Sequence, residues 1–148
     1  MGRLVDGKWV KTSIVTSDNE GRYDRIPRTF RKVIGPESSY SVESGRYHLY
    51  ISYACPWAHR TMIYRQLKGL ENHISFSVVH PDMLDLGWTF EKYNGVGGDD
   101  LYGLNFLHQV YQKAQKDIST SVTVPVLWDK KKETIVNNES SEIIRFFN

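Results

Sequence analysis

Residues 46–68 read RYHLYISYACPWAHRTMIYRQLK, and this stretch decides the fold. Its beginning alternates in polarity and is rich in β-forming residues, which predicts a strand over residues 46–54. The side chains expected on one face of that strand are Tyr47, Leu49, Ile51 and Tyr53. Cys55 and Pro56 end the strand, and residues 57–68 predict a helix because proline suits its first position and basic residues gather near its end. A strand therefore leads through a cysteine into a helix.

The residues that follow continue the alternation of strand and helix. ISFSVVH at 74–80 predicts a second strand, so that strand, helix and strand form a right-handed parallel crossover. A long loop is expected over 81–103, a segment that contains a proline and several glycines. The spacing of apolar residues in LNFLHQVYQKAQK at 104–116 then predicts a second helix.

The last part of the chain predicts a hairpin and a final helix. VTVPVLWD at 122–129 and ETIVN at 133–137 are two β-rich runs around a polar turn. NESSEIIRFFN at 138–148 begins a helix, with Asn138 or Ser140 as the expected cap. The assembled order is β-α-β-α-β-β-α, which is typical of a thioredoxin-like α/β domain.

The beginning of the chain has a different character. Residues 1–45 are polar and mixed in charge, and they show no sustained period of 2.0 or 3.6. We expect an irregular N-terminal extension with short extended pieces over 1–45, followed by the thioredoxin-like domain over 46–148.

Composition limits the class of partner. The 148 residues are 40% hydrophobic and 13% aromatic, enough for one compact core. The net charge of +2 argues against nucleic acid or an anionic membrane as the partner and leaves small molecules. The sequence has no apolar run of the ~20 residues that a membrane span needs, and its first residues lack the apolar core of a secretory signal. We therefore expect a cytoplasmic protein.

Cys55 is the single cysteine, so it cannot form an internal disulfide, a structural zinc site or an iron–sulfur cluster. It is either a buried inert residue or a reactive one. Unpaired amides and the helix dipole at a strand-to-helix junction favour the thiolate. The neighbours expected to support that thiolate are Pro56, Trp57, His59 and Arg60. Thioredoxin-type sites have a second cysteine where this chain has Ala58, so an outside thiol such as glutathione must resolve a disulfide formed here.

Two further pairs of residues suit a peptide ligand with charged ends. Val124-Pro125 lies inside a β run, where proline is normally excluded. A cis bond there would let Val124 offer its N–H and C=O to an extended peptide, whereas an edge strand with a trans proline is the alternative. Glu139 and Ser140 open the last helix and can hold an ammonium and a carboxylate, although helix capping alone also explains them.

Together these motifs resemble a known family. RYHLYISYACPWAHRTMI, HPDMLDLGWTF and TVPVLWDKKKETIVNNESSEIIRFFN are similar to the N-terminal domain of the Xi class of glutathione transferases, the glutathionyl-hydroquinone reductases. The likeness extends over about two-thirds of the chain, and the leader GRLVDGKW fits weakly.

The resemblance implies reductive deglutathionylation of glutathionyl-hydroquinones, with glutathione as co-substrate. Cys55 would attack the sulfur of the substrate and form a mixed disulfide with glutathione. Trp88 would cover the bound tripeptide, Val124 would pair with its backbone, and Glu139 with Ser140 would hold its γ-glutamyl group. A full-length member is expected to form a homodimer.

Two departures from the family pattern leave other functions open. Ser121 stands where members usually carry an arginine that helps bind glutathione. The chain also stops at Asn148, before the all-helical domain of the family, and the apolar side chains of the last helix are expected to be exposed as a result. An omega-like thioltransferase or dehydroascorbate reductase, and a non-catalytic transferase-like binding module, remain alternatives.

The histidines do not indicate a metal site. None of them has HExxH or another ligand spacing, so packing is the expected role for all of them. They are His48, His59, His73, His80 and His108.

Overall fold

The computed structural model covers residues 1–148 and describes all of them except 1, 13–15, 18–19 and 25–27. None of the helices in the described residues is both long and apolar enough to cross a membrane.

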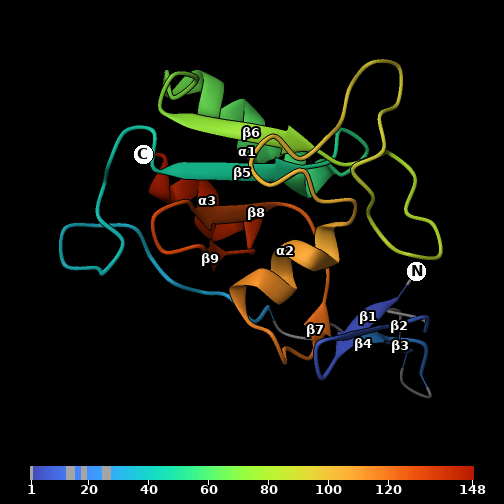
Figure 1. Ribbon diagram of the computed structural model, residues 1–148. Helices are drawn as coiled ribbons and strands as arrows, with labels where there is room; N and C mark the ends of the chain where they lie inside the picture. The colour runs from blue at the N-terminus through green and yellow to red at the C-terminus, as the bar shows by residue number, and fades with distance from the viewer. Residues whose placement is uncertain (1, 13–15, 18–19, 25–27) are drawn as a thin grey trace.

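A four-stranded mixed sheet in the order β6-β5-β8-β9 forms the centre of the molecule (Figure 1). Its parallel half consists of β5 (Tyr47–Ile51) and β6 (Ile74–Val78). Its antiparallel half consists of β8 (Val126–Asp129) and β9 (Thr134–Asn137), and β8 also pairs antiparallel with β5. The parallel crossover and the hairpin expected from the sequence therefore meet in one sheet.

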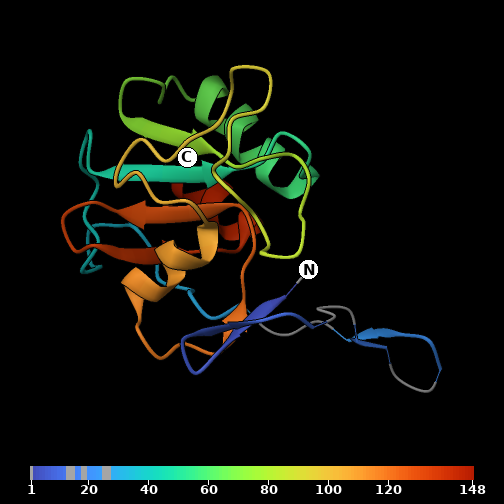
Figure 2. The ribbon, with the colours of Figure 1, turned by 45° about the vertical axis from the view of Figure 1, so that its right-hand side comes forward.

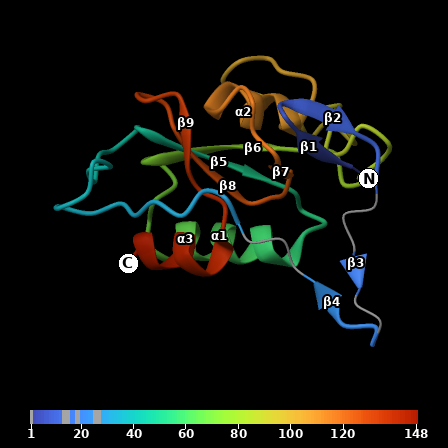
Figure 3. The same ribbon diagram turned by 90° about the horizontal axis from the view of Figure 1, so that it is seen from below.

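Three helices cover the two faces of this sheet. Figure 3 shows α1 (Pro56–Leu67) and α3 (Ser140–Phe146) on one face and α2 (Leu107–Ala114) on the other. Pro56 occupies the start of α1, and Gly69 follows the helix with a φ of 65°, a conformation that glycine adopts without strain. The predicted thioredoxin-like order of strands and helices is confirmed.

The strand predicted before Cys55 is confirmed as β5, and it is buried on both faces. All five of its residues are buried, because β5 lies between two strands and has helices on both faces. Tyr53, which was expected on the same face of the strand as Tyr47, lies beyond the end of the strand and is 57% exposed. Alternation of residue types therefore did not correspond to alternation of burial.

The leader contains short strands. β1 (Arg3–Val5) pairs antiparallel with β2 (Lys8–Val10) and with β7 (Thr120–Ser121), so one hairpin of the leader is joined to the domain (Figure 2). A second pair is formed by β3 (Thr16–Ser17) and β4 (Tyr23–Asp24). The division of the chain at residue 45 stays a prediction.

Asp99 anchors the long loop that precedes α2 to the core. Its buried carboxylate accepts a hydrogen bond from the hydroxyl of Tyr50 at 3.1 Å. The same carboxylate accepts hydrogen bonds from the backbone amides of Leu101 at 3.1 Å and Leu104 at 3.0 Å. The glycine-rich stretch around Asp99 is therefore fixed at its end, where the chain turns toward α2.

Arg46 and Asp129 form a buried ion pair at the edge where β5 begins and β8 ends. The Arg46 Nε lies 3.0 Å from Asp129 Oδ1, and Nη2 lies 2.5 Å from Oδ2. Burial alone would raise the pKa of Asp129, but the hydrogen bonds from Arg46 and from the amides of Lys131 and Lys132 hold the pKa below its usual value. The carboxylate is thus kept charged inside the fold.

The last helix does not expose its apolar side chains as expected. Ile143 and Phe147 are buried, and Ile144 and Phe146 are partly buried. The reason is that α3 packs against α1 and the sheet within this domain, so its apolar residues already have partners. The expectation of an exposed apolar face on this helix is wrong.

His48 gives the fold a measurable dependence on pH. Its imidazole is fully buried, with Nδ1 2.8 Å from Ser75 Oγ and Nε2 3.0 Å from Ser77 Oγ. Burial, with smaller contributions from the charges of Lys130 and Arg65, lowers the pKa of His48 to about 3. Below the unfolded pKa of about 6.5 the unfolded chain therefore binds a proton that the folded chain does not, and stability falls as the pH falls from there toward 3.

We expect His48→Gln to remove this part of the pH dependence. Between pH 7.5 and pH 5 the wild-type chain should lose about 2 kcal/mol through His48, from a slope of about 1.4 kcal/mol per pH unit below pH 6.5. Urea unfolding at the two pH values measures the difference, and the carboxylates contribute equally in both proteins. An unchanged pH dependence in the variant would contradict the assignment.

Candidate active site

Cys55 lies at the N-cap of α1, immediately after the turn that follows β5. Its amide donates to the carbonyl of Ser52 at 3.2 Å, and its own carbonyl accepts from the amide of His59 at 2.9 Å. The thiol is half-buried, and its Sγ lies 3.8 Å from the carbonyl oxygen of Val124. The cysteine is therefore accessible and faces the segment that enters β8.

The Val124–Pro125 peptide bond is cis, one of the two possibilities that the sequence left open. The carbonyl of Val124 faces Cys55. Within the part of the chain that the structure describes, the Val124 amide has no hydrogen-bond acceptor. Next to the thiol, the backbone thus offers one donor and one acceptor to an extended ligand.

Glu139, not Asn138 or Ser140, is the N-cap of α3, so the predicted cap was wrong. Its carboxylate accepts from the amide of Ser141 at 3.2 Å and from the Ser141 hydroxyl at 3.1 Å. The other two side chains have different partners. Asn138 Nδ2 donates to the hydroxyl of Tyr111, and the Ser140 hydroxyl accepts from Arg60.

Arg60 connects α1 to this same segment. Its Nε and Nη2 lie 3.0 and 2.5 Å from Ser140 Oγ, and Nη2 is 3.7 Å from the carboxylate of Glu139. Its guanidinium also lies over the ring of Trp57, which is 49% exposed. These contacts place Arg60 beside the start of α3. The support that we expected Arg60 and the exposed His59 to give the thiolate stays a prediction.

A small polar pocket lies beside the cysteine. It has a volume of about 100 Å³ and is bounded by α1, the segment before β8 and the start of α3. Its lining residues are Arg28, Trp57, Arg60, Val124, Pro125, Asn138, Glu139, Ser140 and Ser141. The structure thus brings together most of the residues that the sequence singled out. With Arg28, which the sequence did not single out, the lining contains two cations and one carboxylate.

Tyr111 of α2 holds the two walls of the pocket in place. Its buried hydroxyl donates to the carbonyl of Thr123 at 2.8 Å and accepts from the Thr123 amide at 3.3 Å and from Asn138 Nδ2 at 3.2 Å. Thr123 precedes Val124, and Asn138 precedes Glu139. Burial raises the pKa of Tyr111, so the hydroxyl keeps its proton. Sequence reasoning treated Tyr111 only as part of an apolar helix face, and nothing in its spacing indicated this role.

Trp88 and Ser121 lie outside the polar pocket. Trp88 is 9% exposed and packs in the hydrophobic core, where its carbonyl accepts from the amide of Leu107. It does not line the polar pocket, and its contact with a ligand stays a prediction. Ser121 is buried in β7 opposite Arg3 of β1.

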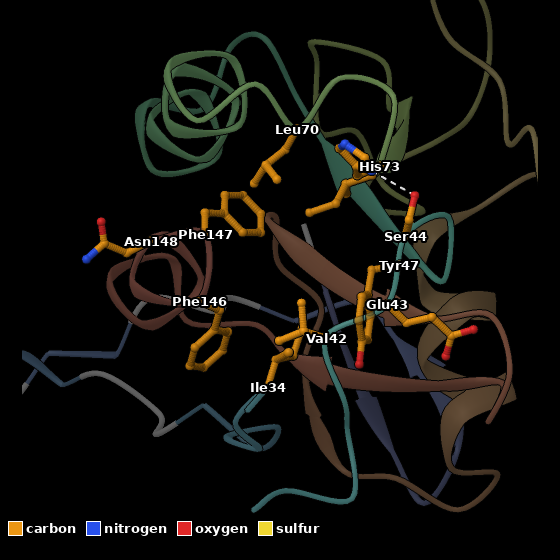
Figure 4. A pocket seen from close by; sticks show the side chains of 11 residues that line it. Ile34, Val42, Glu43, Ser44, Tyr47, Leu70, His73, Phe146, Phe147 and Asn148 are labelled. Carbon is orange, nitrogen blue, oxygen red and sulfur yellow. Dashed lines mark hydrogen bonds between the residues drawn. The ribbon is translucent and has the colours of Figure 1, made fainter. Parts of the chain in front are cut away.

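A larger pocket lies apart from the cysteine (Figure 4). It has a volume of about 370 Å³, and its walls include Tyr47, Leu70 and Phe147. Ser44 Oγ and His73 Nδ1, 2.7 Å apart, lie at its rim. Its mostly apolar lining gives it no set of groups for thiol chemistry. Among the described residues, no cluster of three or more His, Cys, Asp or Glu side chains could hold a metal ion.

The fold and the site together define a thioredoxin-like domain with an accessible cysteine at the start of its first helix. The family model described as the N-terminal domain of glutathione S-transferase matches residues 54–148, and the chain belongs to this family.

Individual relatives and solved structures show which glutathione transferases this chain is similar to. The chain is 52% identical over 157 aligned residues to glutathionyl-hydroquinone reductase YqjG of Escherichia coli (strain K12), covering 100% of this chain and 48% of that protein. It is 53% identical over 133 residues to glutathione S-transferase omega-like 2 of Schizosaccharomyces pombe (strain 972 / ATCC 24843), covering 89% of this chain and 42% of that protein. The chain thus spans about half the length of the curated relatives it matches.

The structural neighbours agree. The Xi-class transferase from Natrialba magadii superimposes with a TM-score of 0.85 at 43% identity, over 99% of this chain and 44% of that one. The glutathione-bound structure of YqjG from Escherichia coli K-12 gives a TM-score of 0.83 at 47% identity, over 99% and 45% of the two chains. The resemblance to the Xi class that the motifs indicated is confirmed.

We expect Tyr111→Phe to loosen both walls of the pocket. The change leaves the Thr123 backbone and the Asn138 amide group without their partner, which should cost about 1–3 kcal/mol in the free energy of unfolding. Urea unfolding measures the cost, and hydrogen exchange at Thr123 and Asn138 should become faster.

Tyr64→Phe is the matched control for Tyr111→Phe, because that tyrosine lies on α1 with its side chain exposed. It should leave both measurements close to wild type. If Tyr111→Phe behaved like this control, the hydroxyl would have no positioning role.

Proposed function

We propose that this chain is the glutathione-binding part of a glutathionyl-hydroquinone reductase, with Cys55 as the nucleophile. The observation that carries the proposal is the position of the Cys55 thiol, 3.8 Å from the Val124 carbonyl and beside a pocket that contains both cationic and anionic side chains. Homology to a reductase of that name and to a glutathione-bound transferase structure supports it.

The proposed reaction has two steps, cleavage of a carbon–sulfur bond and then a thiol–disulfide exchange. The Cys55 thiolate attacks the glutathione sulfur of a glutathionyl-hydroquinone, which forms a Cys55–glutathione disulfide and breaks the bond between that sulfur and the aromatic ring. The ring carbon takes a proton, and the hydroquinone leaves. A second glutathione thiolate then attacks the mixed disulfide, so that oxidised glutathione departs and the Cys55 thiolate returns. The thioether sulfur of the substrate and the thiol of the second glutathione end as the disulfide of oxidised glutathione, and the two electrons that they give up reduce the ring carbon.

The pocket suits the ends of glutathione. In the proposed complex the Val124 amide and carbonyl pair with the backbone of the tripeptide, next to the sulfur that Cys55 attacks. The carboxylate of Glu139 binds the γ-glutamyl ammonium, and the Ser140 hydroxyl contacts the neighbouring carboxylate. Trp88 covers the tripeptide in this proposal, and Pro125 sets the path of the Val124 backbone.

The cellular location, the binding partners and the oligomeric state are part of the same proposal. We place the protein in the cytoplasm, where a single thiol stays reduced and glutathione is abundant. Its partners are glutathione and glutathionyl-hydroquinone-like molecules, without nucleic acid or membrane, and its full-length form is a homodimer.

We expect oxidised glutathione to modify the wild-type chain and not Cys55→Ser. Exchange with the Cys55 thiolate leaves one glutathione on the protein, whereas the serine hydroxyl cannot exchange with a disulfide. Mass spectrometry of the intact protein should show a single glutathione-sized increase that dithiothreitol removes. An unmodified wild-type chain would favour the non-catalytic binding module over the enzyme.

An omega-like thioltransferase or dehydroascorbate reductase is the second candidate, favoured by the similarity to omega-like relatives. The same Cys55 chemistry can support either reaction. Hydroquinone release from a glutathionyl-hydroquinone and reduction of dehydroascorbate, measured with the same protein and glutathione concentrations, separate the two. Faster turnover of dehydroascorbate would replace the first proposal with the second.

A further inference from the structure

Arg28 comes from the leader but lies in the wall of the polar pocket. The two residues after it are fixed to the domain, one through β7 and the other through Asn138, which lines the pocket. Thr29 Oγ1 lies 2.7 Å from Thr120 Oγ1 of β7. The Phe30 carbonyl accepts from the Asn138 amide at 3.1 Å, and the Phe30 amide donates to Asn138 Oδ1 at 3.4 Å. Arg28 is therefore held close to the start of α3.

Of the two guanidinium groups in the pocket wall, that of Arg28 is available to bind a ligand. Arg60 already donates to the Ser140 hydroxyl and lies near the Glu139 carboxylate. Arg28 is half-buried, and the described residues provide it with no hydrogen-bond or ion-pair partner. A half-buried arginine at the wall of a polar pocket, with its donors unused, is suited to an anion that enters the pocket.

We propose that Arg28 binds the α-carboxylate of the γ-glutamyl residue of glutathione, an inference that rests on the proposed function. The γ-glutamyl end has an ammonium and a carboxylate on the same carbon, so its site needs an anion and a cation close together. Glu139 supplies the anion, and Arg28 supplies the cation from the other side of the pocket. The planar guanidinium can contact both oxygens of the carboxylate.

The leader thereby becomes part of the binding site. Two hydrogen bonds between Phe30 and Asn138, one between main-chain groups and one to the Asn138 side chain, link the segment that contains Arg28 to the residue before Glu139. One short segment thus sets the distance between the cation and the anion of the site.

The test compares glutathione with an analogue that lacks the α-carboxylate, γ-aminobutyryl-cysteinyl-glycine. Isothermal titration of the reduced ligands should show that Arg28→Gln weakens glutathione binding about 10- to 100-fold, the effect of losing a hydrogen-bonded charge. The wild-type chain should bind the analogue more weakly than glutathione, by a similar factor. Arg28→Gln should not weaken analogue binding further, because the group that Arg28 contacts is missing.

Two variants control for charge and for folding. Arg28→Lys keeps the positive charge but lacks the planar guanidinium group, so it should retain part of the affinity for glutathione. Arg3→Gln removes an exposed arginine of the same leader and should bind glutathione as wild type does. Thermal unfolding of each variant verifies that it is folded.

The outcomes separate this inference from the function on which it rests. Wild-type affinity for glutathione in folded Arg28→Gln, or an equal loss for glutathione and the analogue, overturns the role of Arg28 and leaves the proposed function intact. A wild-type chain that binds neither ligand and forms no adduct with oxidised glutathione overturns both.

Discussion

The antiparallel pairing of β5 with β8 is the constraint on which the site depends. In that pairing Tyr50 is opposite Val126, so the carboxyl end of one strand lies beside the amino end of the other. Cys55 follows β5, and Val124 precedes β8, which brings the thiol to the Val124 carbonyl although 69 positions separate them in the chain. Without this register, the cysteine would have no backbone edge beside it on which a peptide could bind.

A buried hydroxyl connects the sheet to the remaining wall of the pocket. The Tyr111 hydroxyl forms hydrogen bonds with the Thr123 backbone on one side and with the Asn138 side chain on the other. The Asn138 amide in turn donates a hydrogen bond to the carbonyl of Phe30 in the leader. Unmet hydrogen bonds in a core are costly, so these segments hold one another in fixed positions. The pocket is therefore built from four parts of the chain: the leader, α1, the segment before β8 and the start of α3.

Much of the fold followed from local patterns. The helix after Cys55, the strand at 74–80 and the hairpin at 122–137 all lie close to their predicted positions, because proline, glycine and β-branched residues act over short distances. Burial and helix capping depended on neighbours distant in sequence. β5 is buried on both faces because other elements cover it, and Glu139 caps α3 because Asn138 and Ser140 have tertiary partners.

The sequence by itself determined the chemistry available to this protein: a single thiol at the start of a helix, a proline within a β run, and a glutamate followed by a serine at the head of the last helix. These are properties of residue types and of their immediate neighbours. Only the tertiary structure decided that Arg28 and Tyr111 belong to the same site and that Trp88 is packed in the core. Such contacts depend on strand register and on packing between distant segments, which no local pattern encodes.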